Sequence, residues 1–149
     1  MNWNIYLSGE IHSNWRDEII INCQKLGLPI EFTQPITNHE HSDNCGPKIL
    51  GSQKSQFWDD HNSAKINAIK TKTAIEQADL IIIKFGDKYK QWNTAFEAGY
   101  SHALSKPLIV IHQEENQHAL KEIDAAALAV VKTTNQLIRI LNYIINEKL

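Results

Sequence analysis

Carboxylate, amide and aromatic side chains follow the ends of two apolar runs in this sequence. Gly9 and Glu10 come directly after the first run, and Trp92, Asn93 and Glu97 come after the third. A carboxylate can act as a nucleophile or a proton donor, and an indole ring can stack against a base or a sugar. Because ligands of an open parallel sheet bind beyond the carboxyl ends of its strands, we expect these five residues to converge on one cleft.

Five short apolar runs alternate with helical patterns, which predicts an α/β fold with a parallel sheet. Two of the runs are apolar at consecutive positions, as is typical of central strands covered on both faces. We expect a three-layer α/β/α, flavodoxin-like (Rossmann-like) domain with a five-stranded, mainly parallel sheet in the order 2-1-3-4-5. The expected strands cover residues 3–7, 29–33, 79–85, 107–111 and 127–131.

Helical patterns connect these runs. The expected helices cover about residues 14–25, 66–78, 94–105 and 133–145. Asn14 is expected to cap the first helix, and Thr133 and Gln136 have the spacing of a capping box at the start of the last. Residues 34–58 show no such pattern, and a long connection in a compact domain is usually functional or mobile. We therefore expect an active-site or lid loop there.

Length, charge and hydropathy exclude several classes of protein. The 149 residues fit one domain, 1–149, and 15 Lys and Arg against 17 Asp and Glu leave no basic segment that would hold a nucleic acid. The longest apolar runs are far shorter than the roughly 20 residues of a membrane span, and the first residues lack the features of a secretory signal. We therefore expect a cytoplasmic protein with a small-molecule ligand.

The cysteine and histidine residues give weak support for a metal. Cys23 and Cys45 lack the spacing of a zinc finger or a disulfide framework, so two reduced thiols are expected. His39, His41 and Asp43, followed by Cys45, offer ligand atoms, but a polar surface loop explains them equally well. The glycines are too sparse for a phosphate-binding P-loop. We expect neither a metal nor a cofactor.

Several candidate residues have a structural explanation as well as a functional one. Thr94 and Glu97 have the spacing of a capping box, in which Glu97 would bond only to the start of its own helix. Glu10 and His12 could be solvated loop residues, and Trp15, at the start of the first expected helix, is more typical of a core. The residues alone leave these alternatives open.

Two segments carry a resemblance to a known family. Residues 92–100 (WNTAFEAGY) and 103–110 resemble the signature of the nucleoside 2-deoxyribosyltransferases, and residues 5–9 are similar to the first strand and glycine turn of that family. More narrowly, residues 6–16 and 88–94 resemble the YtoQ family, a group with a nucleoside deoxyribosyltransferase-like fold. The resemblance implies that Glu97 attacks the anomeric carbon of a nucleoside and forms a glycosyl ester. It also implies a homodimer or a higher homo-oligomer.

The same resemblance implies roles for the residues around Glu97. Tyr6 and Asn93 would position Glu97 or the sugar, and Glu10 would be an acid or a sugar ligand. The remaining implied substrate-binding residues are Gly9, His12, Trp92 and Thr94.

The sequence departs from the family pattern at two places. Many members carry aspartates where this chain has Gln91 and either Asn67 or Thr71. Glu10, Asp59 and Asp60 are the candidate replacements for the missing acid.

The leading hypothesis is an enzyme that acts on the N-glycosidic bond of a nucleoside or nucleotide, as a hydrolase or a deoxyribosyltransferase with Glu97 as nucleophile. The alternatives are a non-catalytic module that binds a nucleoside or nucleotide, and an interaction scaffold without a ligand. The base, the sugar, and the choice between hydrolysis and transfer rest on a few hydrogen bonds that a sequence does not show.

Overall fold

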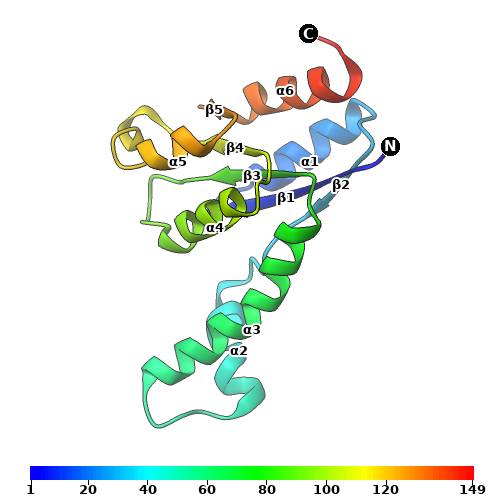
Figure 1. The fold of residues 1–149 in the computed structure, drawn as a ribbon. Coiled ribbons are helices and arrows are strands. Elements are labelled where there is room, and N and C mark those ends of the chain that lie inside the picture. The colour runs from blue at the N-terminus through cyan, green and yellow to red at the C-terminus, as the bar shows by residue number, and fades with distance from the viewer.

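Five parallel strands form the centre of the molecule. The computed structural model describes all residues, 1–149. The strands are β1 (Trp3–Gly9), β2 (Ile30–Thr33), β3 (Leu80–Lys84), β4 (Leu108–Ile111) and β5 (Ala129–Val131). They lie in the order β2-β1-β3-β4-β5, and every neighbouring pair is parallel. This confirms the predicted fold class and strand order (Figure 1).

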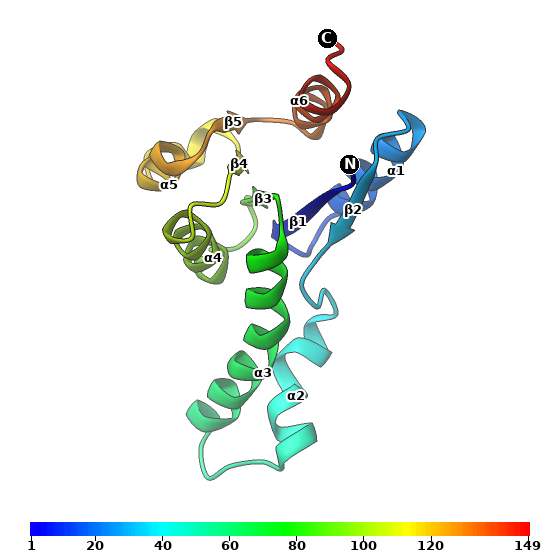
Figure 2. The same cartoon turned by 45° about the vertical axis from the view of Figure 1, so that its right-hand side comes forward.

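Helices cover both faces of the sheet. On one face lie α1 (Trp15–Lys25) and α6 (Thr134–Asn146), which pack against each other. On the other face lie α3 (Gln56–Gln77), α4 (Trp92–Ala103) and the short α5 (Lys121–Ala126), which is preceded by the 3-10 helix η1 (Glu114–Asn116). Figure 2 shows the two layers with the strands between them. No helix has the combination of length and apolar character that a bilayer crossing requires.

The alternation of side chains along the strands divides the core into two clusters. Ile5 and Leu7 of β1 pack towards α1 and α6, whereas Tyr6 packs towards the opposite layer together with Ile81 and Ile83 of β3. Successive side chains of a strand point to opposite faces, so Ser8 shares the face of Tyr6. The sequence of β1 therefore directs two hydroxyl groups towards the layer that contains α4.

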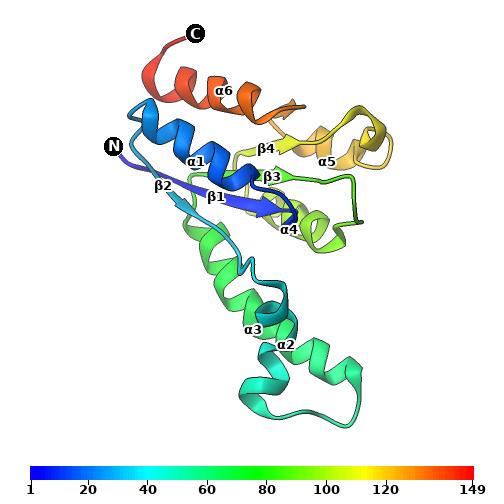
Figure 3. The ribbon, with the colours of Figure 1, turned by 180° about the vertical axis from the view of Figure 1, so that it is seen from behind.

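The expected loop at residues 34–58 is largely helical, which corrects the prediction. Helix α2 (His39–Leu50) lies within it and forms an antiparallel hairpin with α3, whose first residues also lie within the expected loop. The Asn38 side chain caps α2 by accepting a hydrogen bond from the His41 N–H at 2.9 Å. The hairpin projects from the sheet (Figures 1 and 3). The sequence of α2 has no apolar periodicity, because polar contacts rather than an apolar face hold α2 against α3.

Those polar contacts converge on Ser63 of α3. Pro47 lies inside α2 and has no N–H, so it cannot bond to the Asp43 carbonyl one turn earlier. The Ser63 hydroxyl donates to that carbonyl at 2.8 Å and accepts from the Gly46 N–H at 2.9 Å. A Cβ on Gly46 would lie 2.7 Å from the Ser63 nitrogen, so only glycine allows this approach.

The helix ends differ from the predictions in detail. The capping box of α6 is confirmed, because Thr133 and Gln136 exchange the expected hydrogen bonds. Asn14 occupies the N-cap position of α1 but makes no side-chain capping bond. Helix α4 begins at Trp92, two residues before the expected start at Thr94.

Candidate active site

A cleft of about 980 Å³ opens at the carboxyl edge of the sheet. Its walls are the loop after β1, the loop after β3, helix α4 and the α2–α3 hairpin. Five of the residues singled out from the sequence line it: Gly9, Glu10, His12, Asn93 and Glu97. The two strand ends meet here because β1 and β3 are neighbours in the sheet. Their following helices pack on opposite faces, which is the geometry of a ligand site in such sheets.

Glu97 is bonded to β1 and not to the start of its own helix. Its Oε2 atom accepts hydrogen bonds from the Ser8 hydroxyl at 2.5 Å and the Tyr6 hydroxyl at 3.3 Å. Both donors are fully buried, and they reach the same atom because they alternate along β1. Helix α4 has no side-chain cap at its N-terminus. The capping-box interpretation of Glu97 is therefore wrong.

Burial has the largest effect on the pKa values of Glu97 and Tyr6. Burial raises the pKa of Glu97, and the hydrogen bonds from Ser8 and Tyr6 with the nearby charge of Arg16 oppose this only in part. The pKa of Tyr6 is also raised, first by burial and then by the negative charge of Glu97. Tyr6 therefore stays protonated and donates to Glu97. Because both hydroxyls bond to Oε2, the other carboxylate oxygen, Oε1, carries no hydrogen bond within the chain.

Gly9 makes the tight turn at the end of β1. Its φ is +126°, and a Cβ at this position would lie 2.1 Å from the Lys84 carbonyl oxygen of β3. The next residue, Glu10, donates its N–H to that same carbonyl at 3.0 Å. Only glycine fits between the two strands here, which explains its place before Glu10.

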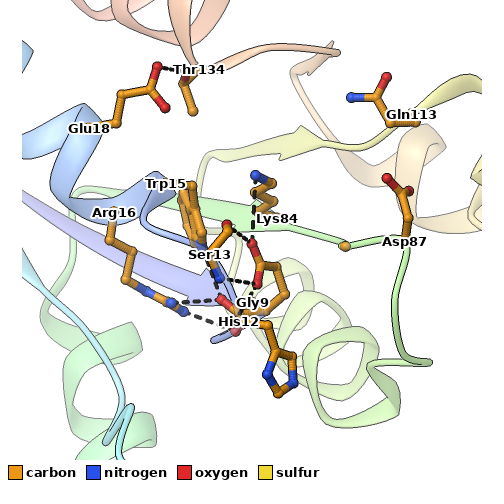
Figure 4. Close-up of polar contacts among 12 residues, drawn as sticks. Gly9, His12, Ser13, Trp15, Arg16, Glu18, Lys84, Asp87, Gln113 and Thr134 are labelled. Atoms are coloured by element: carbon orange, nitrogen blue, oxygen red, sulfur yellow. Dashed lines mark hydrogen bonds and ion pairs between the residues drawn. The ribbon is translucent and has the colours of Figure 1, made fainter.

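The Glu10 side chain is 6% exposed and bonded within the chain. Its Oε2 accepts from the N–H groups of His12 at 2.6 Å and Ser13 at 3.1 Å, its Oε1 accepts from the Ser13 hydroxyl, and Lys84 Nζ lies 3.6 Å from Oε1 (Figure 4). Burial alone would raise the pKa of Glu10, but these hydrogen bonds and the Lys84 charge outweigh it and lower the pKa. Glu10 is thus held ionised, which disfavours the expected role of proton donor.

Trp15 and Arg16 fix the backbone of the same turn. The Trp15 indole N–H donates to the Glu10 carbonyl at 2.9 Å. Arg16 is 5% exposed and donates to the carbonyls of Leu7 at 3.2 Å, Gly9 at 2.9 Å and Glu10 at 2.7 Å. Both side chains are therefore structural supports (Figure 4). Their roles depend on the path of the turn, which no local pattern predicts.

Three of the expected substrate-binding residues, Tyr6, Trp92 and Thr94, lie outside the cleft lining, which corrects the sequence-based expectation. Tyr6 is fully buried and reaches the site only through its hydrogen bond to Glu97. Trp92 is 77% exposed, because α4 begins at this residue and directs the indole away from the sheet. Thr94 is 1% exposed and lies on the buried face of α4. The aromatic residues that line the cleft are Tyr89, Phe96 and Tyr100, and the ring centroid of Tyr89 lies 4.6 Å from that of His12.

The polar side chains of Gln91, Asn67 and Thr71 have partners in the chain. The Gln91 side chain accepts from the Gly86 N–H at 3.0 Å and so fixes the loop after β3. Asn67 donates to the Ser42 carbonyl at 2.8 Å, and the Thr71 hydroxyl lies beside Tyr6.

The two aspartates proposed as replacement acids lie in different places. Asp59 accepts from the Gln53 N–H at 2.7 Å near the turn of the hairpin and is not in the cleft lining. Asp60 lines the cleft, as does Asp43, whose Oδ2 lies 2.9 Å from His39 Nδ1. No three His, Cys, Asp or Glu side chains are grouped as a metal site would require.

Comparisons with solved structures identify proteins of similar fold. The structure is similar to a solved 2-deoxyribosyltransferase from Bacillus psychrosaccharolyticus, with 19% identity, a TM-score of 0.56 and coverage of 91% of this chain and 90% of the other. It is also similar to a conserved protein from Enterococcus faecalis V583, with 14% identity, a TM-score of 0.64 and coverage of 97% and 99%. These structural likenesses show the fold.

The sequence comparisons show the family. The chain is 46% identical over 144 residues to the uncharacterized protein YtoQ of Bacillus subtilis (strain 168), with 97% of each chain covered. A family model described as nucleoside 2-deoxyribosyltransferase YtoQ matches residues 6–145. This chain therefore belongs to the YtoQ family of nucleoside 2-deoxyribosyltransferase-like proteins.

Proposed function

We propose that this protein cleaves the N-glycosidic bond of a nucleoside or nucleotide, with Glu97 as the nucleophile. The observation that carries the proposal is the environment of the Glu97 carboxylate. One oxygen is held by Ser8 and Tyr6, and the other has no bond within the chain, in a residue that lines the cleft. A carboxylate positioned in this way suits attack on a carbon that develops oxocarbenium character.

In the first step, Oε1 of Glu97 forms a bond to the anomeric carbon while the bond from that carbon to the base nitrogen breaks. The electron pair of the broken bond leaves with the base, which takes up a proton. In the second step, water or another base attacks the glycosyl ester, and the Glu97 carboxylate leaves with its electron pair. The hydroxyls of Ser8 and Tyr6 stabilise that carboxylate through Oε2.

The proton for the leaving base needs a donor other than Glu10, which is held ionised. Asp43 and Asp60 are the remaining carboxylates in the cleft lining. Asn93 and His12 also line it, and we assign them contacts with the sugar or the base. The His12 and Tyr89 rings provide an aromatic surface against which a base can stack.

A second candidate function is a module that binds a nucleoside or nucleotide without cleaving it. One observation favours it: the Gln91 amide occupies a position where many family members have an aspartate, and it bonds to the Gly86 backbone. Such a protein would keep the cleft and lack an acid for the leaving base.

A panel of nucleosides and nucleotides, with released base measured by chromatography, tests the enzymatic function. The wild type should release base, whereas Glu97→Gln and Glu97→Ala should release none, because neither amide nor methyl can form the glycosyl ester. Glu122→Gln, which changes an exposed carboxylate on α5, is the matched control and should retain activity. Turnover retained by Glu97→Gln would reject the nucleophile.

If the wild type releases no base, binding separates the remaining possibilities. Stabilisation against heat by a nucleoside, lost in Glu97→Gln, would support the binding module. Absence of stabilisation by every compound in the panel would favour a scaffold without a ligand.

We also propose that the protein is a homodimer. Four large apolar side chains are more than half exposed around the turn between α2 and α3, which supports an interface there: Ile49, Leu50, Phe57 and Trp58. Sedimentation of the wild type and of Trp58→Ser tests this, because a dimer through this surface should dissociate in the variant.

A further inference from the structure

Glu10 occupies a position in which an anion would bind. The backbone N–H groups of His12 and Ser13 and the Ser13 hydroxyl all point to its carboxylate, just before the first turn of α1. Lys84 Nζ adds a positive charge 3.6 Å away. Backbone N–H groups, a hydroxyl and a lysine at the start of a helix are also the donors that hold phosphate groups in proteins. Here the chain supplies the anion itself.

The neighbouring residues are shaped to hold the Glu10 side chain in this place. A Cβ on Gly86 would lie 2.9 Å from Glu10 Cγ, so the absence of a side chain at residue 86 gives Glu10 its space. Trp15 and Arg16 bind the Glu10 carbonyl and fix its backbone. With 6% of the residue exposed, the carboxylate is a buried and fully bonded part of the turn.

The same residue is part of the ligand cleft. Gly9, Glu10, Ile11 and His12 line it together with Glu97. Glu97 is bonded to Ser8, two residues before Glu10, so the ionised Glu10 lies close to the proposed reaction centre. A phosphate group entering at this point would find its donors already used and would meet a negative charge.

We propose that Glu10 is a specificity-determining residue, whose carboxylate fills the anion position beside the cleft and so selects ligands that carry no phosphate there. The inference rests on the proposed function and narrows its substrate class to nucleosides without a phosphate at the end that faces the loop after β1. Glu10 takes no part in the bond-breaking step in this account.

Titration calorimetry of the full chain with inorganic phosphate tests the proposal without any need for turnover. Removing the carboxylate in Glu10→Ala frees three hydrogen-bond donors and the Lys84 charge. Since hydrogen bonds to charged groups are the stronger ones, phosphate should bind about tenfold to a hundredfold more tightly to the variant than to the wild type. Glu10→Gln keeps the packing and removes the charge, so it should show a smaller gain in phosphate affinity. This variant provides the test if Glu10→Ala does not fold.

Two further variants locate the effect. Glu18→Ala removes an exposed carboxylate from α1, the helix that follows the turn of Glu10, and it should bind phosphate as weakly as the wild type. Adding Lys84→Met to Glu10→Ala should remove most of the gain. Tight phosphate binding by the wild type, no gain in either Glu10 variant, an equal gain in Glu18→Ala, or a gain that does not depend on Lys84 would each overturn the proposal.

The substrate pair completes the test. The wild type should bind 2′-deoxyadenosine more tightly than its 5′-phosphate. The ratio of the two affinities should shrink at least tenfold in Glu10→Ala. The phosphate measurement supports or rejects the role of Glu10 even when no variant releases base. Failure of the glycosidase reaction therefore stays distinguishable from failure of this inference.

Discussion

The contact between α2 and α3 predicts opposite effects for the same substitution at two helical glycines. Gly46 lies in α2 and Gly99 in α4. A Cβ on Gly46 would lie 2.7 Å from the Ser63 nitrogen and 2.9 Å from the Asp59 carbonyl oxygen, and both atoms belong to the backbone of α3. A Cβ on Gly99 would meet no atom within 4 Å. Gly46→Ala must therefore separate two helices, whereas Gly99→Ala adds a methyl group in open space.

The magnitudes follow from these contacts. Alanine is better than glycine in a helix interior by about 0.5–1 kcal/mol, and this is the whole effect expected at Gly99. At Gly46, overpacking costs about 1–3 kcal/mol, and loss of the bond from Gly46 to Ser63 adds about 0.5–1.5 kcal/mol. After the gain in helix propensity is subtracted, the net effect is a loss of about 0.5–4 kcal/mol. For a chain of this length, 1 kcal/mol corresponds to about 3 °C in Tm.

Thermal unfolding followed by circular dichroism measures both variants. Gly99→Ala should raise Tm by about 2–3 °C, and Gly46→Ala should lower it by about 2–12 °C. Hydrogen exchange should show faster exchange of the α2 amides in Gly46→Ala, because the hairpin is held by the contacts around Ser63. An increase of Tm in Gly46→Ala would refute the close approach of α2 and α3 described above.

Two other predictions concern Glu97 and the contact between Asp124 and His112. Glu97 must be ionised to attack, and burial raises its pKa, so base release should fall about tenfold for each pH unit below that pKa. Ser8→Ala removes a hydrogen bond that lowers the pKa of Glu97, so the acid limb of the kcat/KM profile should move to higher pH. An unchanged acid limb would show that the Ser8 hydroxyl does not influence the ionisation of Glu97. Asp124 accepts from His112 Nε2 at 2.9 Å, and the other ring nitrogen faces the Gln113 carbonyl at 2.7 Å. Asp124→Ala leaves the buried His112 with an unpaired nitrogen and should cost about 1–3 kcal/mol, a fall of about 3–9 °C in thermal unfolding; an unchanged Tm would show that the pair does not stabilise α5 against the sheet.

The site was predictable from the sequence where the prediction depended on the ends of strands. Gly9, Glu10 and Glu97 were expected at the carboxyl edge of the sheet, and they line the cleft there. The role of Ser8 was missed, although its alternation with Tyr6 along β1 was visible and places both hydroxyls on one face. The position of Trp92 was wrong because the first residue of α4 decides in which direction each side chain of the helix points.

The sequence by itself determined the sheet and the place of the cleft in it. Consecutive apolar residues in β3 and β4 mark central strands, and a flavodoxin-like winding predicts the strand order that the structure has. Tertiary structure decided which groups surround each carboxylate. Ser8 and Glu97 are 89 residues apart, and Glu10 and Lys84 meet only because β1 and β3 are neighbours. The pKa of a carboxylate depends on burial and on partners brought from distant parts of the chain, so the opposite shifts of Glu97 and Glu10 are properties of the folded molecule.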